Sequence, residues 1–96
     1  VMEYNASATG EKYREIARAM GVSNVDGMSQ EEYRKAAVDA VRKLASDVGI
    51  PKDLKGIAKE EDVRFLSESA VADACAPGNP KEATLEDIEM LYRKLL

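Results

Sequence analysis

Cys75 has the side chain in this sequence that is most capable of covalent chemistry. It is the only cysteine among 96 residues, and it stands where an apolar helical pattern meets the loop sequence CAPGNPKEA. A thiol reacts as its thiolate, which a neighbouring histidine or cation favours. The chain contains no histidine, and the nearest basic residue in sequence is Lys81. Cys75 is therefore expected to be a small buried apolar residue or part of a pocket wall, not a nucleophile.

Two acidic runs, at residues 60–62 and at residues 86, 87 and 89, supply the other groups that could bind a ligand. Calcium loops need oxygen ligands at alternating positions around a turn glycine, and neither run has that spacing. The first run is typical of a helix N-terminus, and the second of a solvated helix face. One thiol and no histidine also exclude a zinc finger. The sequence therefore predicts no metal site.

The charge balance argues against two classes of partner. The chain carries 14 basic and 18 acidic residues, a net charge of −4, with the two signs interspersed. Binding to nucleic acid or to an anionic membrane surface requires a positive stripe, so both are unlikely partners. No apolar run approaches a membrane span, and no signal-like segment opens the chain. With a single cysteine, a reducing cytoplasm is the expected location.

Four amphipathic helices are expected, in one all-α domain that forms a small bundle-like array. Ser29 with Glu32, and Thr84 with Asp87, have the spacing of capping boxes at helix starts. Gly21 and Gly49 favour helix ends, since glycine enters the left-handed region at no steric cost. The expected helices span residues 10–20, 30–48, 60–74 and 85–95. Residues 1–5 are too short for an independent element and resemble the last turn of a helix that begins upstream.

The apolar spacing also predicts which helix faces are buried. Val38 and Ala45 widen the apolar arc of the long helix and leave room for a partner on a second side. Glu31 with Lys35, and Asp39 with Lys43, are expected as ion pairs of its polar side. The predicted buried faces are Tyr13, Ile16, Ala17 and Met20; Tyr33, Ala36, Ala37, Ala40, Val41, Leu44 and Val48; Val63, Leu66, Ala70 and Ala74; and Leu85, Ile88, Leu91, Tyr92 and Leu95, with Leu54 and Ile57 entering the core from the connector.

Four strings of the sequence resemble one protein family. They are VMEYNA, GEKYREIARAMGV, SDVGIPKDL and ADACAPGNPKEATLEDIEMLY, at residues 1–6, 10–22, 46–54 and 72–92. In this order they resemble the C-terminal helical, dehydroquinate synthase-like domain of iron-containing (group III) alcohol dehydrogenases. Within that family the likeness is greatest to the lactaldehyde reductases, also called propanediol oxidoreductases, and the 1,3-propanediol dehydrogenases rank second.

The resemblance implies that residues 1–96 are a C-terminal fragment of a longer, homo-oligomeric enzyme. Such a parent has an N-terminal domain that binds NAD(H) and an iron held by one Asp and three His. It interconverts a short diol or alcohol and its aldehyde. The partners implied are the missing nucleotide-binding domain and metal-binding segment of the same chain. Only Cys75 maps onto a position that lines the substrate pocket.

None of the implied iron ligands can be assigned to residues of this sequence, since it has no histidine. The resemblance also implies that the residues that bind NAD(H) lie upstream of it. The fragment by itself is therefore expected to bind neither iron nor cofactor and to oxidise no alcohol. The alternative is a stand-alone helical module for protein interaction, in which the apolar stripe of the long helix would be a partner groove.

Overall fold

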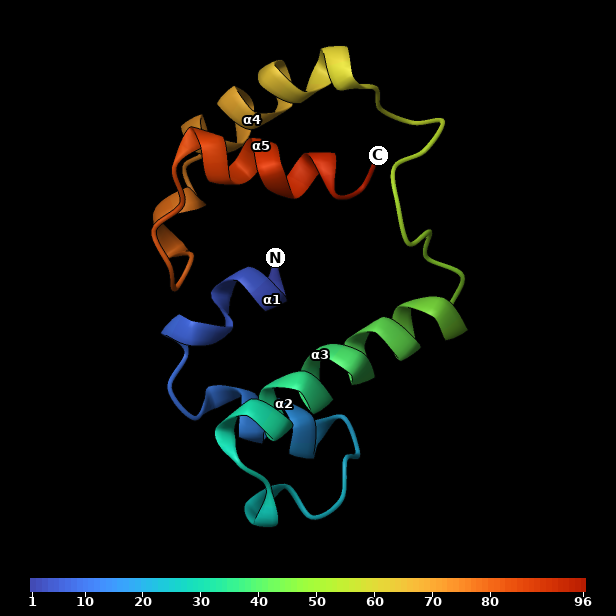
Figure 1. The fold of residues 1–96 in the computed structure, drawn as a ribbon, viewed down its shortest axis with the longest axis vertical. Coiled ribbons are helices and arrows are strands. Elements are labelled where there is room, and N and C mark those ends of the chain that lie inside the picture. Colours follow the sequence, from blue (N-terminus) through green and yellow to red (C-terminus); the bar gives the residue numbers. More distant parts are fainter. The chain divides into compact units, whose positions relative to one another are not determined.

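The computed structural model describes all of residues 1–96 and contains helices but no strand. The all-α prediction is confirmed, and each of the four predicted helices is present, with boundaries shifted by a few residues. No helix is both long and apolar enough to cross a bilayer. The α-helices are α1 (Met2–Asn5), α2 (Lys12–Ala19), α3 (Gln30–Asp47), α4 (Val63–Ala72) and α5 (Leu85–Arg93) (Figure 1). Four short 3-10 helices cover Ala6–Ala8, Val25–Gly27, Glu60–Asp62 and Ala76–Gly78.

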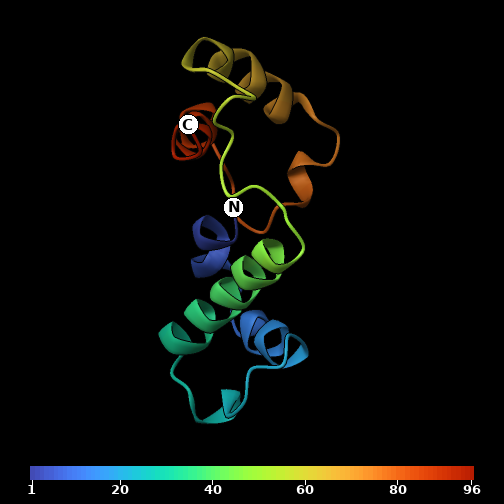
Figure 2. The same cartoon turned by 90° about the vertical axis from the view of Figure 1, so that its right-hand side faces the viewer.

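The chain forms two compact units, unit 1 (Val1–Ile50) and unit 2 (Pro51–Leu96). In unit 1, α2 packs against α3, and the loop through Val25 packs against the same core (Figures 1 and 2). The core of unit 1 consists of Tyr13, Ala17, Val25, Tyr33, Ala37 and Val38, with Met2, Ala6, Ile16, Val22 and Met28 partly buried against it. The N-terminal turn therefore contributes to this core, although it is too short to fold independently.

Helices α2 and α3 of unit 1 end in the same way. Gly21 and Gly49 adopt φ values of 88° and 81°, as the sequence predicted. In α2 the Val22 amide donates to the Ala17 carbonyl at 3.0 Å, and in α3 the Ile50 amide donates to the Ala45 carbonyl at 2.9 Å. This is the Schellman motif, which satisfies carbonyls at a helix C-terminus and turns the next apolar residue back towards the helix.

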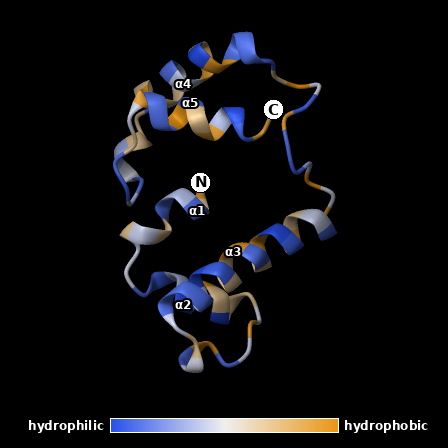
Figure 3. Ribbon diagram, in the orientation of Figure 1, coloured by the Kyte–Doolittle hydropathy of each residue, from blue (hydrophilic) through white to orange (hydrophobic).

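In unit 2, α4 and α5 lie side by side (Figures 1 and 2). Thr84 closes a capping box with Asp87, as Ser29 does with Glu32 in unit 1, so both predicted boxes are confirmed. The connector is fixed to the C-terminal end by a hydrogen bond of 2.8 Å from the Leu54 amide to the Leu95 carbonyl. Hydrophobic positions recur between hydrophilic ones along both helices (Figure 3).

The predicted buried faces are only partly correct. Tyr33 and Ala37 are buried, but Leu44 and Val48 are 50% and 64% exposed, because α3 is much longer than α2 and extends past the core. Val38, which was expected off the main stripe, is buried. In unit 2 only Val63 and Ser67 are fully buried, and no residue of α5 is. Exposed residues that were expected inside are Ile57, Ala74 and Leu95.

The ion pairs of α3 also differ from the expected register. Lys35 pairs with Asp39, and Lys43 pairs with Asp47 at 2.6 Å. Each lysine thus uses the carboxylate four residues later, not the one four residues earlier. Both choices lie on the same helix face, so the sequence spacing does not distinguish them.

Candidate functional site

Cys75 lies at the start of the loop that follows α4. Its backbone N–H donates to Asp73 Oδ1 at 2.7 Å, and its carbonyl accepts the Gly78 amide at 3.0 Å across the 3-10 turn Ala76–Gly78. The Asn79 side-chain amide donates to the Lys81 carbonyl at 2.5 Å and closes the second half of the loop. Local hydrogen bonds therefore determine the backbone path around the cysteine.

The Cys75 thiol is free and its side chain is exposed. The expectation of a small buried apolar residue is therefore wrong, because α4 ends at Ala72 and the following residues lie on the surface. A role in a pocket wall remains a prediction. Cys75 lines neither of the two surface depressions described below.

The acidic run at residues 60–62 forms the 3-10 turn directly before α4, and its side chains are held by contacts within unit 2. Glu60 pairs with Arg93 at 2.6 Å, and Asp62 Oδ2 accepts the Lys59 amide at 2.9 Å. The chain holds no group of three or more His, Cys, Asp or Glu side chains placed to hold a metal ion. The helix-start interpretation of this run agrees with these contacts.

The second acidic run departs from the expected solvated face at Glu89. This side chain is only 14% exposed and lies between Arg64 of α4, at 3.2 Å, and Arg93 of α5, at 3.5 Å. The pKa of Arg64 is raised chiefly by its hydrogen bond to Glu68, and that of Arg93 by its hydrogen bond to Glu60. The charges thus link α4 to α5 and to the turn before α4. They act as a structural network.

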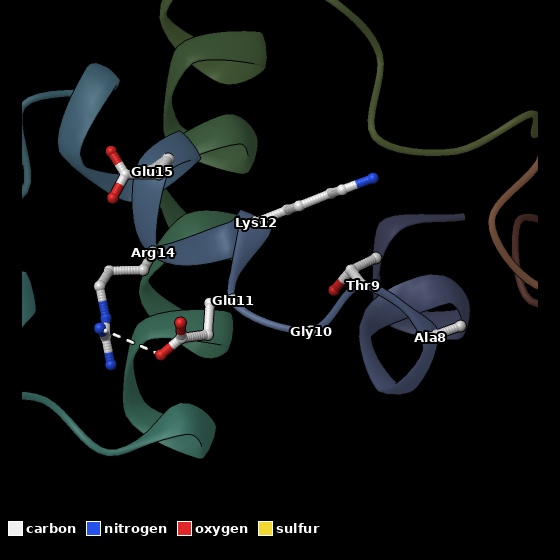
Figure 4. Close-up of a pocket in the computed structure, with 7 residues that line it drawn as sticks. All are labelled: Ala8, Thr9, Gly10, Glu11, Lys12, Arg14 and Glu15. Atoms are coloured by element: carbon white, nitrogen blue, oxygen red, sulfur yellow. Dashed lines mark ion pairs between the residues drawn. The ribbon is translucent and has the colours of Figure 1, made fainter.

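An open depression with a volume of about 570 Å³ lies at the N-terminus of α2, which the sequence did not single out. Figure 4 shows Glu11 paired with Arg14, at 3.2 Å, while the Lys12 side chain extends away from this pair. The Arg14 guanidinium also lies over the Tyr33 ring, 4.8 Å from its centroid. The lining residues are Ala8, Thr9, Gly10, Glu11, Lys12, Arg14 and Glu15.

The backbone at the edge of this depression is held from α3. The Gly10 carbonyl accepts from Arg34 Nη2 at 3.0 Å, from Gln30 Nε2 at 3.3 Å and from Tyr33 Oη at 3.4 Å. Tyr13 Oη donates to the Met2 carbonyl at 2.7 Å, and burial raises the Tyr13 pKa. These contacts attach the N-terminal turn to the core of unit 1.

A second depression, of about 280 Å³, lies between α1 and α3. Arg42 crosses it and binds Glu3 at 2.6 Å and Asp39 at 3.7 Å. Four of its charged side chains thus pair with one another, namely Glu3, Lys35, Asp39 and Arg42, and the surface is structural. No residue type in the sequence pattern identified either depression, because both depend on how α1 and α2 lie against α3.

Comparison with known proteins gives consistent results. The whole of residues 1–96 matches the family described as the Fe-containing alcohol dehydrogenase family, C-terminal. The chain is 58% identical over 93 residues to a lactaldehyde reductase of Escherichia coli (strain K12), which covers 96% of this chain and 24% of that protein. It is 32% identical over 97 residues to an NAD-dependent methanol dehydrogenase of Bacillus methanolicus, covering 100% of this chain and 25% of that protein.

The fold agrees with this assignment. A crystal structure of a 1,3-propanediol oxidoreductase superimposes with a TM-score of 0.92 at 33% identity and covers 100% of this chain and 25% of that one. The chain thus spans about a quarter of the length of the relatives it matches. The higher identity to the lactaldehyde reductase than to the 1,3-propanediol enzyme is the order that the sequence strings predicted. The chain therefore belongs to the Fe-containing alcohol dehydrogenase family and corresponds to the C-terminal part of that family.

Proposed function

We propose that residues 1–96 are the C-terminal part of an NAD(H)-dependent, iron-dependent alcohol dehydrogenase that interconverts a short diol or alcohol and its aldehyde. The observation that carries this proposal is the match of the entire chain to one family, at 58% identity to a lactaldehyde reductase. The NAD-dependent methanol dehydrogenase among the relatives supports the choice of cofactor. The single free cysteine is compatible with a reducing compartment, so the cytoplasm is part of the proposal.

The residues of this chain do not fit an iron site by themselves. The chain has no histidine, and no three potential ligands converge. By themselves, residues 1–96 therefore support no catalytic step at iron. In the proposed enzyme, the upstream nucleotide-binding domain and metal-binding segment hold NAD(H) and iron, and the parent chain forms a homo-oligomer. Residues 1–96 then act as one helical domain that completes the protein around that centre.

A chimera tests this assignment. The C-terminal segment of the Escherichia coli lactaldehyde reductase that matches this chain is replaced by residues 1–96, and NADH-dependent reduction of lactaldehyde is measured. We expect turnover in the chimera and none in the 96-residue chain alone. The matched control is the same reductase truncated before the replaced segment. A folded, iron-loaded chimera without activity would contradict the proposal.

The proposed role of Cys75 is steric, as part of the wall beside the carbon chain of the substrate. Its exposure on a hydrogen-bonded loop supports this role, because the side chain is available to a surface contributed by the rest of the protein. In the chimera, Cys75→Ser should leave kcat/KM within about tenfold, a barrier change of roughly 1.4 kcal/mol. Cys75→Leu should shift preference towards smaller alcohols, since it removes pocket volume. Loss of all activity in the serine variant, with iron still bound, would show that the thiol takes part in the chemistry.

A further inference from the structure

The two helices of unit 2 form an antiparallel hairpin that buries little apolar surface. Arg64 of α4 pairs with Glu89 of α5. Glu60, four residues before Arg64, pairs with Arg93, four residues after Glu89, so the helices run in opposite directions (Figure 1). Val63 is the only fully buried hydrophobic side chain in unit 2. Because half-buried apolar side chains can pack in more than one way, they specify the relative position of two helices only weakly.

Glu89 is the most enclosed charged group of this hairpin's ion pairs. Its side chain is only 14% exposed, whereas the side chains of Arg64 and Arg93 are 63% and 49% exposed. Each carboxylate oxygen has its own partner, since Oε1 accepts from Arg64 Nη1 at 3.2 Å and Oε2 accepts from Arg93 Nη1 at 3.5 Å. A carboxylate that loses water needs such partners, because an unpaired buried charge is costly. Dockings of α5 that keep Glu89 beside Arg64 of α4 are therefore favoured over those that separate the two.

The two arginines are themselves held by further carboxylates. Arg64 binds Glu68, one turn later in α4, at 2.6 Å, and Arg93 binds Glu60, in the turn before α4, at 2.6 Å. A shift of α5 by one helical turn along α4 would move the partners in both pairs between the two sides of the hairpin apart by about 5 Å. Exposed ion pairs add little stability, so the main effect of this network is on which docking is adopted.

We propose that Glu89 fixes the register in which α5 docks against α4, and with it the conformation of the Cys75 loop, residues 73–84. This loop joins the last residue of α4 to the first residue of α5, so its two ends must follow the helices. Glu89 lies outside the loop and acts on it through Arg64, which makes it a positioning residue. Selection of one register among similar packings is the best-attested use of an enclosed polar group. The proposal holds whether or not Cys75 forms part of a pocket wall.

An apolar residue in place of Glu89 separates register from stability. In the 96-residue chain, Glu89→Leu should leave the Tm of unit 2, followed by the amide NMR signals of α4 and α5, within about 3 °C of the natural value or raise it. The amide signals of residues 73–84 should nevertheless double or broaden, because more than one register is then populated. Glu86→Leu is the matched control. It removes the same charge from an exposed position one turn earlier in α5, and it should keep a single set of loop signals.

Arg64→Met tests the same contact from the side of α4. It should also give more than one set of loop signals, and it should lower the Tm of unit 2, because the Glu89 carboxylate loses a partner. A single set of loop signals at the natural positions in both variants would overturn the proposal. A fall in Tm of more than about 5 °C in Glu89→Leu with one set of signals would overturn it as well. So would loss of folded unit 2 in both variants, since the network would then stabilise a docking that other contacts select.

Discussion

The two units of the chain bury their apolar faces to different degrees. Unit 1 has six buried hydrophobic residues, drawn from α2, α3 and the turn that holds Val25. Unit 2 has one, Val63, beside the buried Ser67. The apolar periodicity of α5 is nevertheless as clear in the sequence as that of α2. Amphipathic pattern is thus a property of each helix, whereas burial depends on how many other segments surround it.

The physical reason is the number of elements available to each unit. In unit 1, α3 is covered by α2, by the N-terminal turn and by the loop through Val25, so its first half is enclosed. In unit 2, α4 has α5 as its main helical neighbour, and two helices cover only one side of each other. The ion pair that joins the two helices is that of Arg64 in α4 with Glu89 in α5, and the Arg64 side chain is 63% exposed. Exposed ion pairs contribute little stability, so unit 2 should be the weaker unit.

The largest expected effect is at Tyr33, which is 1% exposed at the centre of unit 1. Tyr33→Ala should destabilise the chain by about 3–5 kcal/mol, because it leaves a cavity and removes the surface on which Arg14 rests. Urea unfolding followed by circular dichroism measures this. Tyr33→Phe is the control, and should cost less than about 1 kcal/mol, since the hydroxyl bond to Gly10 is long at 3.4 Å. A cost of Tyr33→Ala below that of Tyr33→Phe would refute the assignment of the core.

Val63 is the corresponding residue of unit 2. Val63→Ala should cost about 1.5–3 kcal/mol, from two lost carbons and a small cavity. Amide hydrogen exchange should accelerate in α4 and α5 and remain unchanged in α2 and α3, because the two units have separate cores. Equal acceleration in α3 would mean that the units unfold together and that the comparison between them does not apply to stability.

The capping boxes should contribute equally in both units. Ser29→Ala and Thr84→Ala each remove a side-chain acceptor, for the Glu32 and Asp87 amides at 3.2 Å, and should each cost about 1 kcal/mol. Thermal unfolding of the two variants measures these costs. The matched control is Ser46→Ala, within α3, which should have little effect. A much smaller cost for Thr84→Ala would indicate that α5 is frayed at its start.

The Glu32 side of this box adds a dependence on pH. Hydrogen bonds from Ser29 lower the Glu32 pKa below its usual value of 4.5, because they favour the ionised carboxylate. Its stabilising contribution is therefore full above that value and is lost as the pH falls through the lower folded-state pKa. The stability difference between the natural chain and Glu32→Gln should accordingly disappear in acid. A difference that persists unchanged at pH 2 would be inconsistent with this linkage.

The smallest effect is expected at Ser67, whose hydroxyl is fully buried in unit 2 without a hydrogen-bond partner. Ser67→Ala should change stability by less than about 0.5 kcal/mol or increase it, since it removes an uncompensated polar group. Ser69→Ala is the control, because the Ser69 hydroxyl is exposed and bonds the Phe65 carbonyl at 2.9 Å. A loss of more than about 1 kcal/mol on Ser67→Ala would show that the hydroxyl does have a partner, such as a bound water.

Helix positions and ends could be predicted because they depend on neighbours in sequence. Ser29 and Thr84 begin helices through bonds to residues three positions away, and Gly21 and Gly49 end them through their own backbone freedom. Family membership could also be predicted from the sequence, because strings such as the one around Cys75 are specific to that family. The role of Cys75 could not be predicted in the same way. Its exposure depends on where α4 ends and on which surfaces adjoin the loop.

The sequence by itself determined the all-α class, the positions of the four main helices to within a few residues, and the apolar side of each helix, since these follow from local hydrogen bonding and from a period of 3.6 residues. Tertiary structure decided which part of each apolar side is buried. It enclosed Tyr33 and Val38 but left Leu44 exposed, and it placed Glu89 between two arginines. The physical reason is that burial requires atoms from distant segments. Their number and position are not encoded in the periodicity of the helix that they cover.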